Sequence, residues 1–399
     1  MVYPDESLTA LIQERARHYH DDTVAMRRHL HRHPELSTEE RETVRYIARQ
    51  LAAWHIPYQD GLADTGLCAT IQGLEPDSRC VALRADMDAL PITEQTGLPF
   101  ASETPGVMHA CGHDAHMACL LGTARILQET KDRWKGTVKL IFQPSEEDFR
   151  SGAPQMIAGG VLENPKPQHI YAMHVLPDMP AGKVGMKAGQ YMASTDELYL
   201  TVKGKGGHAA TPELNVDTVI LAANILTSLQ QVVSRQAPPY IPTVLSFGRI
   251  IGEGRTNIIP SEVHIEGTIR TFNEDWRKRA HANITRCAVE TARAMGGDCE
   301  VKVDHGYPFV LNDTEATRRA HDLACQLFSP ENVEELPLRM TAEDFAYYSH
   351  LIPACLFRLG TANPALKGSQ SNLHTPEFTV DESALLTGVC LMTALGMAG

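Results

Sequence analysis

Two hydrophobic periodicities alternate along the first 190 residues of this chain. Apolar residues at helical spacing predict helices at about 8–31 and 37–54, and short continuous apolar runs predict buried strands. Ser37 and Glu40 have the spacing of a capping box, which predicts that the second helix begins there. The other elements expected in this part are strands at 67–71, 80–85, 136–143 and 170–175, and a helix at 117–127.

The pattern changes between about Tyr191 and Val303 to strand, helix, strand, strand, helix, strand. This order is that of a split β-α-β, ferredoxin-like unit, which is small enough to be an inserted domain. Beyond Asp304 the alternation of helix and strand resumes. The sequence therefore predicts an α/β fold. A larger domain with a mixed sheet flanked by helices (1–190 and 304–399) is interrupted by a ferredoxin-like α+β domain (191–303).

Length and composition favour a two-domain globular enzyme, because 399 residues exceed what one hydrophobic core usually serves. The net charge of −13 and the lack of a Lys/Arg block argue against nucleic acid and anionic membranes as partners. No apolar run is long enough to span a bilayer, and the N-terminus carries acids where a secretory signal carries bases. Nine scattered cysteines are typical of free thiols, so a cytoplasmic location is expected.

The stretch 109–116 concentrates three imidazoles, a thiol and a carboxylate in eight residues. Cys111 and His113 lie two residues apart, so the backbone can direct a thiolate and an imidazole at one divalent ion. A buried cysteine beside a hydrogen-bonded histidine explains this pair equally well. The interpretation therefore depends on partners elsewhere in the chain.

Carboxylates follow two of the predicted strands. Asp86 ends the strand at 80–85, and the carboxyl ends of strands face the crevice where open α/β sheets bind ligands. Asp88 is instead expected to make local backbone bonds in a turn. Glu146 and Glu147 cannot both point the same way, which suits one metal ligand and one general base. A solvated acidic turn is the alternative for this pair.

Five further histidines have expectations of their own. His174 ends another predicted strand and is either a structural residue or a ligand. His374 is expected to be exposed beside a carboxylate. His29, His31 and His33 lie among arginines, which would repel a cation, so solvated or capping roles are predicted for them.

These residues together resemble the dinuclear metallo-aminoacylase and carboxypeptidase family. The resemblance is strongest to the amidohydrolase branch with hippurate hydrolases, indole-acetyl-amino-acid hydrolases and N-acetyl-diaminopimelate deacetylases. It covers essentially the whole chain. One local departure is the stretch 143–147, where relatives often have Ala or Gly before the paired glutamates. Another is 148–150, in place of a glycine-rich run; neither touches a ligand position. The matching stretches are 31–36, 84–91, 109–116, 143–147, 206–210 and 374–378.

The resemblance implies two divalent metal ions per subunit, bridged by Cys111 and a water molecule. It places His113 and His174 on one ion and Glu147 and His374 on the other. A thiolate with imidazoles favours zinc, and the carboxylates also admit manganese, cobalt or nickel.

The resemblance also implies roles around the metals. Glu146 takes a proton from the bridging water and passes it to the leaving amine, while Asp86 orients a ligand imidazole. His208, from the lid of a partner subunit, polarises the scissile carbonyl; a loop histidine that caps glycines is the alternative. Asn257 and Arg270 resemble positions that grip the substrate carboxylate.

The expected protein is therefore a metal-dependent amidohydrolase that cleaves N-acyl amino acids or amino-acid conjugates. Its inserted domain is expected to act as a lid and to form a homodimer. A dipeptidase or carboxypeptidase is the alternative within the same chemistry. Missing ligands would favour a non-catalytic binding protein on the same fold, and none is missing. A serine hydrolase is disfavoured because no Gly-x-Ser-x-Gly motif is present.

Overall fold

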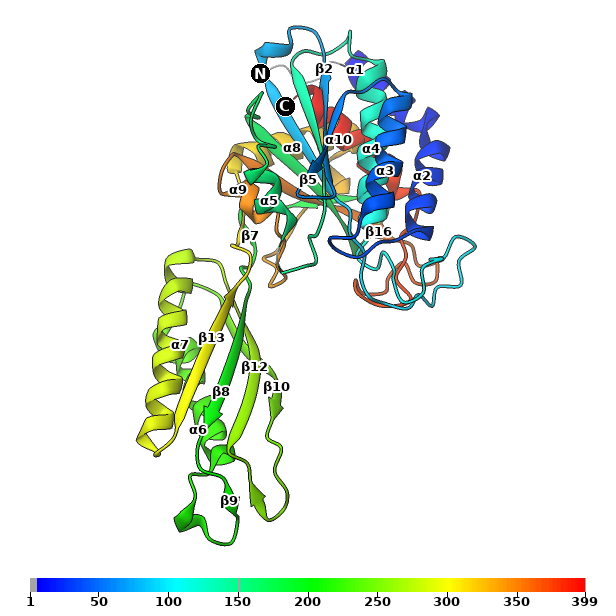
Figure 1. The fold of residues 1–399 in the computed structure, drawn as a ribbon. Helices are drawn as coiled ribbons and strands as arrows, with labels where there is room; N and C mark the ends of the chain where they lie inside the picture. Colours follow the sequence, from blue (N-terminus) through cyan, green and yellow to red (C-terminus); the bar gives the residue numbers. More distant parts are fainter. Residues whose placement is uncertain (1–5, 150, 399) are drawn as a thin grey trace. The chain divides into compact units, whose positions relative to one another are not determined.

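The computed structural model describes residues 6–149 and 151–398, which divide into two compact units (Figure 1). The first unit contains the described residues up to Tyr191, Leu311–Pro337, and the described residues from Asp344 onward. The second unit contains Met192–Val310 and Leu338–Glu343. The second unit is therefore inserted into the chain of the first.

A mixed eight-stranded sheet forms the centre of the first unit, in the order β1-β2-β4-β3-β5-β16-β6-β15. Strands β4, β3, β5 and β16 are parallel, and antiparallel pairs join β1 to β2, β2 to β4 and β6 to β16. This confirms the predicted mixed sheet. The strands span Tyr58–Leu62 (β1), Gly66–Gln72 (β2), Cys80–Asp86 (β3), Thr137–Gln143 (β4), His169–Pro180 (β5), Val184–Met186 (β6), Val333–Glu335 (β15) and Ala354–Ala362 (β16).

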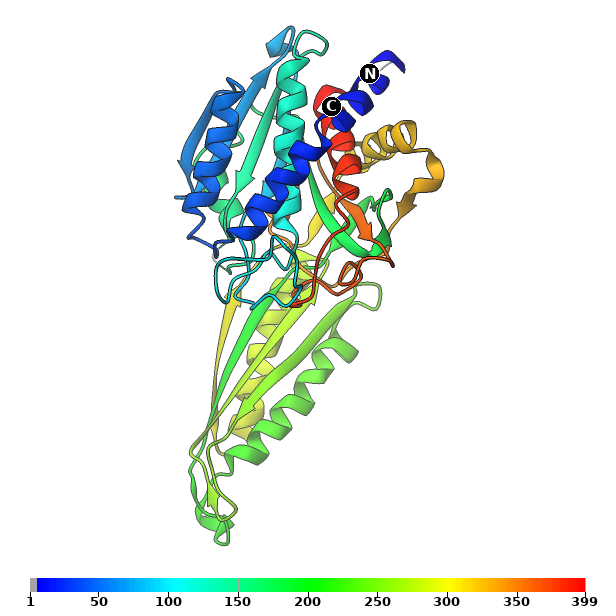
Figure 2. The ribbon, with the colours of Figure 1, turned by 90° about the vertical axis from the view of Figure 1, so that its right-hand side faces the viewer.

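Helices cover both faces of this sheet (Figures 1 and 2). Helices α4 and α10 pack on one face of the central strands, where their apolar side chains share one core with β3. The short helices α5 and α9 lie on the opposite side. None of the helices among the described residues is long and apolar enough to cross a membrane. The helices span Glu6–His18 (α1), His20–Arg32 (α2), Arg41–Ala53 (α3), His113–Glu129 (α4), Gly152–Ala158 (α5), Thr314–Phe328 (α8), Ala346–Ser349 (α9) and Ala384–Ala398 (α10).

The predicted single helix at 8–31 is wrong, because the chain turns at Tyr19 and forms two helices. The turn lets α1 pack against α10 while α2 packs against α4. Packing against different helices therefore divides a segment whose periodicity predicted one continuous helix.

Strand β1 was not predicted, since most of its residues are exposed and it lacks an apolar run.

The predicted capping box is also wrong, because both of its side chains have distant partners. The Ser37 hydroxyl donates to Asp88 (2.6 Å), and the buried Glu40 carboxylate accepts from the Ser145 amide (2.8 Å). Helix α3 begins at Arg41 without a side-chain cap from Glu40. Tertiary hydrogen bonds therefore replace the local ones.

The second unit is a four-stranded antiparallel sheet in the order β10-β12-β8-β13. Alternate apolar residues of β8 point into one core, which is covered by helices α6 and α7. The order of elements confirms the predicted ferredoxin-like arrangement. The elements span Asp196–Lys203 (β8), Gly207–His208 (β9), Thr218–Gln231 (α6), Thr243–Ile251 (β10), Ile258–Ile259 (β11), Glu262–Thr271 (β12), Glu274–Ala294 (α7) and Asp298–His305 (β13); Gly189–Met192 (β7) and Val310–Asn312 (β14) pair where the chain passes between the units.

Candidate metal centre

Polar side chains gather at the edge of the first unit's sheet where the parallel strands β3 and β4 reach their carboxyl ends, beside the middle of β5, which continues past the predicted end at 175 to Pro180. Strand β3 ends at Asp86, β4 leads directly to Glu146 and Glu147, and His174 lies on β5. The carboxyl ends of neighbouring parallel strands meet at one edge, so residues distant in sequence come together there.

The turn before α4 requires a glycine. Gly112 has a φ of 84°, in the left-handed region that favours glycine. A Cβ atom at this position would lie 2.5 Å from a methyl group of Val175. This close approach to β5 sets the turn between Cys111 and His113, so that both reach the same group of polar residues.

Five residues form two overlapping groups of candidate metal ligands, and Cys111 belongs to both. The first group is completed by His113 and His174, and the second by Glu147 and His374; within each group the ligand atoms lie within 4.8 Å of one another. Cys111 Sγ is 3.4 Å from His174 Nε2, and Glu147 Oε1 is 3.1 Å from His374 Nε2. The structure thus brings together all five residues for which a ligand role was predicted.

The hydrogen bonds of these side chains leave suitable donor atoms for a divalent cation. The Nδ1 atom of His113 donates to the Asp88 carbonyl oxygen (2.8 Å), and that of His174 donates to the Val175 carbonyl oxygen (2.9 Å). Such bonds direct the Nε2 lone pair to a metal. His113 Nε2 and Glu147 Oε1 are buried, make no hydrogen bond to a described residue, and lie 4.0 Å apart; Glu147 Oε1 has its ion-pair contact with His374. These residues fit divalent metal ions, which would supply partners for these atoms.

The electrostatics of the centre also favour a cation. Burial raises the pKa of the Cys111 thiol well above its ordinary value, and the carboxylates of Glu147 and Glu146 raise it further. Burial alone would lower the pKa of His113, but nearby carboxylates, above all Asp86, outweigh this effect and raise it to about 10. The centre therefore attracts positive charge, and a bound metal ion would stabilise the thiolate.

Asp88 supports both ligand groups, which shows that the prediction of a local turn role is wrong. Its side chain is buried, and it accepts hydrogen bonds from the Ser37 hydroxyl (2.6 Å) and the Glu147 amide (2.9 Å). Its Oδ1 atom lies 3.3 Å from His113 Nδ1. The partners are distant in sequence, so the spacing of Asp88 could not indicate them.

Asp86 has its shortest imidazole contact with His116, one of the histidines that flank Cys111 and His113 in the sequence. Asp86 Oδ1 lies 2.5 Å from His116 Nδ1, and His116 Nε2 accepts from the Val175 amide (3.0 Å). Asp86 Oδ2 is 3.8 Å from His113 Nε2. That Asp86 orients a ligand imidazole stays a prediction.

His31 contradicts its predicted solvated or capping role, whereas His33 is exposed. His31 is fully buried, with Nδ1 2.8 Å from Asp114 and Nε2 3.2 Å from Glu94. The buried Arg27 also binds Asp114 (2.7 Å). Because Asp114 lies in the first turn of α4, this network connects α2 to the helix that begins with His113.

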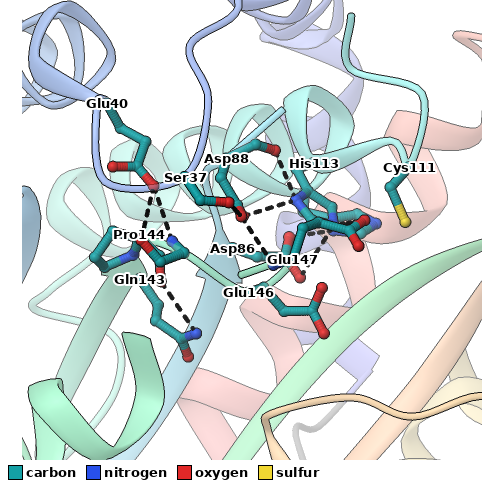
Figure 3. Close-up of polar contacts among 12 residues, drawn as sticks. Ser37, Glu40, Asp86, Asp88, Cys111, His113, Gln143, Pro144, Glu146 and Glu147 are labelled. Carbon is teal, nitrogen blue, oxygen red and sulfur yellow. Dashed lines mark hydrogen bonds and ion pairs between the residues drawn. The ribbon is translucent and has the colours of Figure 1, made fainter. Parts of the chain in front are cut away.

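Glu146 lies beside the two ligand groups without belonging to either. Figure 3 shows the Glu146 carboxylate near the Glu147 carboxylate and the His113 ring. Potential ligand atoms of these three residues lie within 4.8 Å of one another. Glu146 is buried and accepts from the Asp344 amide (3.4 Å). This position is compatible with its predicted role as general base, which stays a prediction.

The other predicted residues belong to the second unit. His208 is exposed on β9, and its Nδ1 atom accepts from the Ala210 amide (3.0 Å). Asn257 directly precedes β11, which pairs with β9. Arg270 lies near the other end of the sheet, because its neighbour Ile269 pairs with the first residue of β8. His208 and Asn257 are thus brought together within this unit, and Arg270 lies apart from them.

The α/β fold and the two ligand groups beside a buried carboxylate define a metal-dependent hydrolase. The sequence profile of peptidase family M20/M25/M40 matches residues 82–398. The chain is 40% identical to N-acetylcysteine deacetylase of Bacillus subtilis, over 92% of this chain and 94% of the relative. It is 35% identical to thermostable carboxypeptidase 1 of Saccharolobus solfataricus, over 96% of each chain.

A solved structure supports the same family. A dinuclear metal-binding peptidase of the M20 family from Bacillus subtilis matches with a TM-score of 0.81 and 36% identity, over 96% of this chain and 98% of the other. The chain therefore belongs to peptidase family M20/M25/M40. This confirms the resemblance noted in the sequence and the assignment of the chain as a metal-dependent amidohydrolase.

Proposed function

We propose that this protein hydrolyses the amide bond of an N-acyl amino acid or a related amino-acid conjugate with two divalent metal ions. The observation that carries the proposal is the presence of Cys111 in both ligand groups, because a shared thiolate can bridge two ions. The relative named N-acetylcysteine deacetylase supports this substrate class.

The proposal assigns His113 and His174 to one ion, Glu147 and His374 to the other, and Cys111 to both. When bound, the ions supply Lewis-acid activation of a water molecule and of the scissile carbonyl. The thiolate and imidazoles favour zinc, while the carboxylates also admit manganese, cobalt or nickel. We place the protein in the cytoplasm, and its nine free cysteines support that location.

Glu146 accepts a proton from the attacking water and delivers it to the leaving nitrogen. Its burial beside His113 and Glu147 supports this role, since general bases act from within hydrogen-bond reach of the reacting atoms. Asp86 acts indirectly, by holding imidazoles in the orientation that the ligands require.

In this proposal, residues 191–303 form the lid and dimerisation domain of a homodimer. In the sequence this domain interrupts the catalytic domain, which consists of 1–190 and 304–399. His208 polarises the scissile carbonyl of the partner's site, and its exposure on β9 supports this. Asn257 and Arg270 bind the substrate carboxylate. Arg270 is half-buried without an ion pair to any described residue, which leaves its guanidinium available for bidentate binding.

The function is tested by removing metal with a chelator, reloading the enzyme with zinc, manganese, cobalt or nickel, and measuring hydrolysis. The substrate panel contains N-acyl amino acids with varied acyl groups, together with dipeptides of the same C-terminal residues. Hydrolysis of the N-acyl compounds that is lost on chelation and restored by metal is expected. No hydrolysis of any N-acyl compound under any metal would contradict the proposal.

A dipeptidase or carboxypeptidase is the second candidate, and the relative named a carboxypeptidase favours it. The same panel separates the two functions, because both use the same centre on an amide bond. A kcat/KM value for dipeptides at least tenfold above that for every N-acyl amino acid would establish the second candidate. The reverse ratio is expected.

Subunit exchange tests the trans-acting His208. His208→Ala and Glu146→Gln homodimers are both expected to be nearly inactive. In a mixed dimer one site carries both lesions and the other carries neither, so partial activity returns on exchange. Exchange is verified with differently tagged subunits. If mixed dimers form and activity does not return, His208 does not act across the subunit interface.

A further inference from the structure

We propose that Asp344 is a positioning residue that holds Glu146 and Glu147 in place, a role that rests on the proposed function. Asp344 lies about 200 residues beyond this pair in sequence and is the residue at which the chain re-enters the first unit after Leu338–Glu343. No sequence motif near Glu146 indicates this partner.

The buried carboxylate of Asp344 connects the end of β4 to the start of α5. It accepts from the side-chain amide of Gln143, the last residue of β4 (2.7 and 2.9 Å). It also accepts from the Ser151 hydroxyl (2.8 Å) and the Ala153 amide (3.1 Å) at the start of α5. Glu146 and Glu147 follow β4 and precede α5, so one carboxylate holds the structure on both sides of them.

The backbone on both sides of the pair is strained and therefore needs such support. Ser145 and Ser151 have φ values of 55° and 52°, in the left-handed region that costs non-glycine residues free energy. Gly152 packs so closely that an added Cβ would overlap the Pro144 carbonyl oxygen. Backbone of this kind persists only where surrounding contacts over-determine it. Asp344 supplies such contacts at Ser151.

Asp344 also contacts the proposed general base and its surroundings. Its amide donates to Glu146 Oε1 (3.4 Å), and its carboxylate binds the buried Arg84 guanidinium (2.7 Å). Arg84 in turn binds Asp86 (2.6 Å) and Gln143 (3.0 Å). These buried hydrogen bonds connect the ends of β3 and β4 to Glu146 as one network.

This geometry predicts unequal effects on the two ions. The group of Cys111, His113 and His174 makes no direct hydrogen bond to the Asp344 carboxylate and is connected to it only through Arg84 and Asp86. Glu147 of the other group lies in the segment that Asp344 holds directly on both sides. Loosening this backbone should lower the affinity for the ion held by the group of Glu147 and should displace Glu146. The ion held by His113 and His174 should keep its ligands.

The test is Asp344→Asn, which removes the negative charge. It retains the size of the side chain and the backbone N–H that donates to Glu146. Metal titration against a competing chelator should show one zinc ion with wild-type affinity and a second one weakened about tenfold or more. The kcat value should fall at least tenfold, with KM changed by less than about threefold. Ser151→Ala removes a single hydrogen bond and should lower the affinity for the same zinc ion about threefold.

Asp196→Asn is the matched control, because Asp196 is also buried and bound to an arginine, Arg277 (2.5 Å), but lies in the second unit. It should leave both zinc affinities unchanged. Wild-type zinc affinities and kcat in Asp344→Asn, or equal weakening of both ions, would overturn the inference. If Asp344→Asn does not fold, unchanged affinities in Ser151→Ala overturn it instead. Wild-type enzyme that binds two ions but cleaves no N-acyl amino acid contradicts only the proposed function.

Discussion

Glu146→Gln is expected to retain both metal ions and to lower kcat by about two orders of magnitude or more, because glutamine cannot accept the proton of the attacking water. A hundredfold loss corresponds to about 2.7 kcal/mol of transition-state stabilisation. Glutamine has nearly the size of glutamate and can still accept from the Asp344 amide. Steady-state kinetics and metal analysis of the same preparation measure both quantities.

Glu163→Gln is a suitable control, because Glu163 is exposed and its side chain belongs to neither ligand group. It should leave kcat and metal content unchanged. If Glu146→Gln loses metal in proportion to activity, Glu146 is a ligand and the roles of Glu146 and Glu147 must be exchanged.

Cys111→Ser is expected to have the largest effect, with activity below detection and loss of at least one ion per subunit. Cys111 is the candidate ligand shared by both groups, and a serine hydroxyl stays protonated where a thiol becomes a thiolate. His374→Ala should remove a ligand of one group alone, so it should retain more metal than Cys111→Ser. Competition with a chelator measures both affinities.

Cys325→Ser provides the matched control, since Cys325 is half-buried on α8 and belongs to neither ligand group. Its activity and metal content should equal those of the wild type. Full activity of Cys111→Ser with two retained ions would exclude Cys111 from the centre.

Local sequence determined most elements of the fold, because periodicity reports directly which face of a helix or strand is buried. The ferredoxin-like order of the second unit is an example, since strand and helix periods alternate clearly between about Tyr191 and Val303. Failures occurred where periodicity continues through a turn, as at Tyr19, or where capping residues have distant partners, as with Ser37 and Glu40.

The chemistry of the centre could also be anticipated, because thiol, imidazole and carboxylate side chains after strands are unusual unless they bind a ligand. Which of them meet was decided only by the tertiary structure. The parallel order of β4, β3 and β5 brings Glu147 and His174 to one edge, and the contact of Gly112 with Val175 places Cys111 between them.

The roles of the residues around the candidate ligands were decided entirely by the tertiary structure. Asp88, His31 and Asp344 were given local or no roles from the sequence, yet each is buried and bonded to residues far away in the chain. A buried carboxylate can be satisfied by any donor that folding brings near it. Sequence spacing carries no information about such partners, whereas it does report the local geometry of Cys111 and His113.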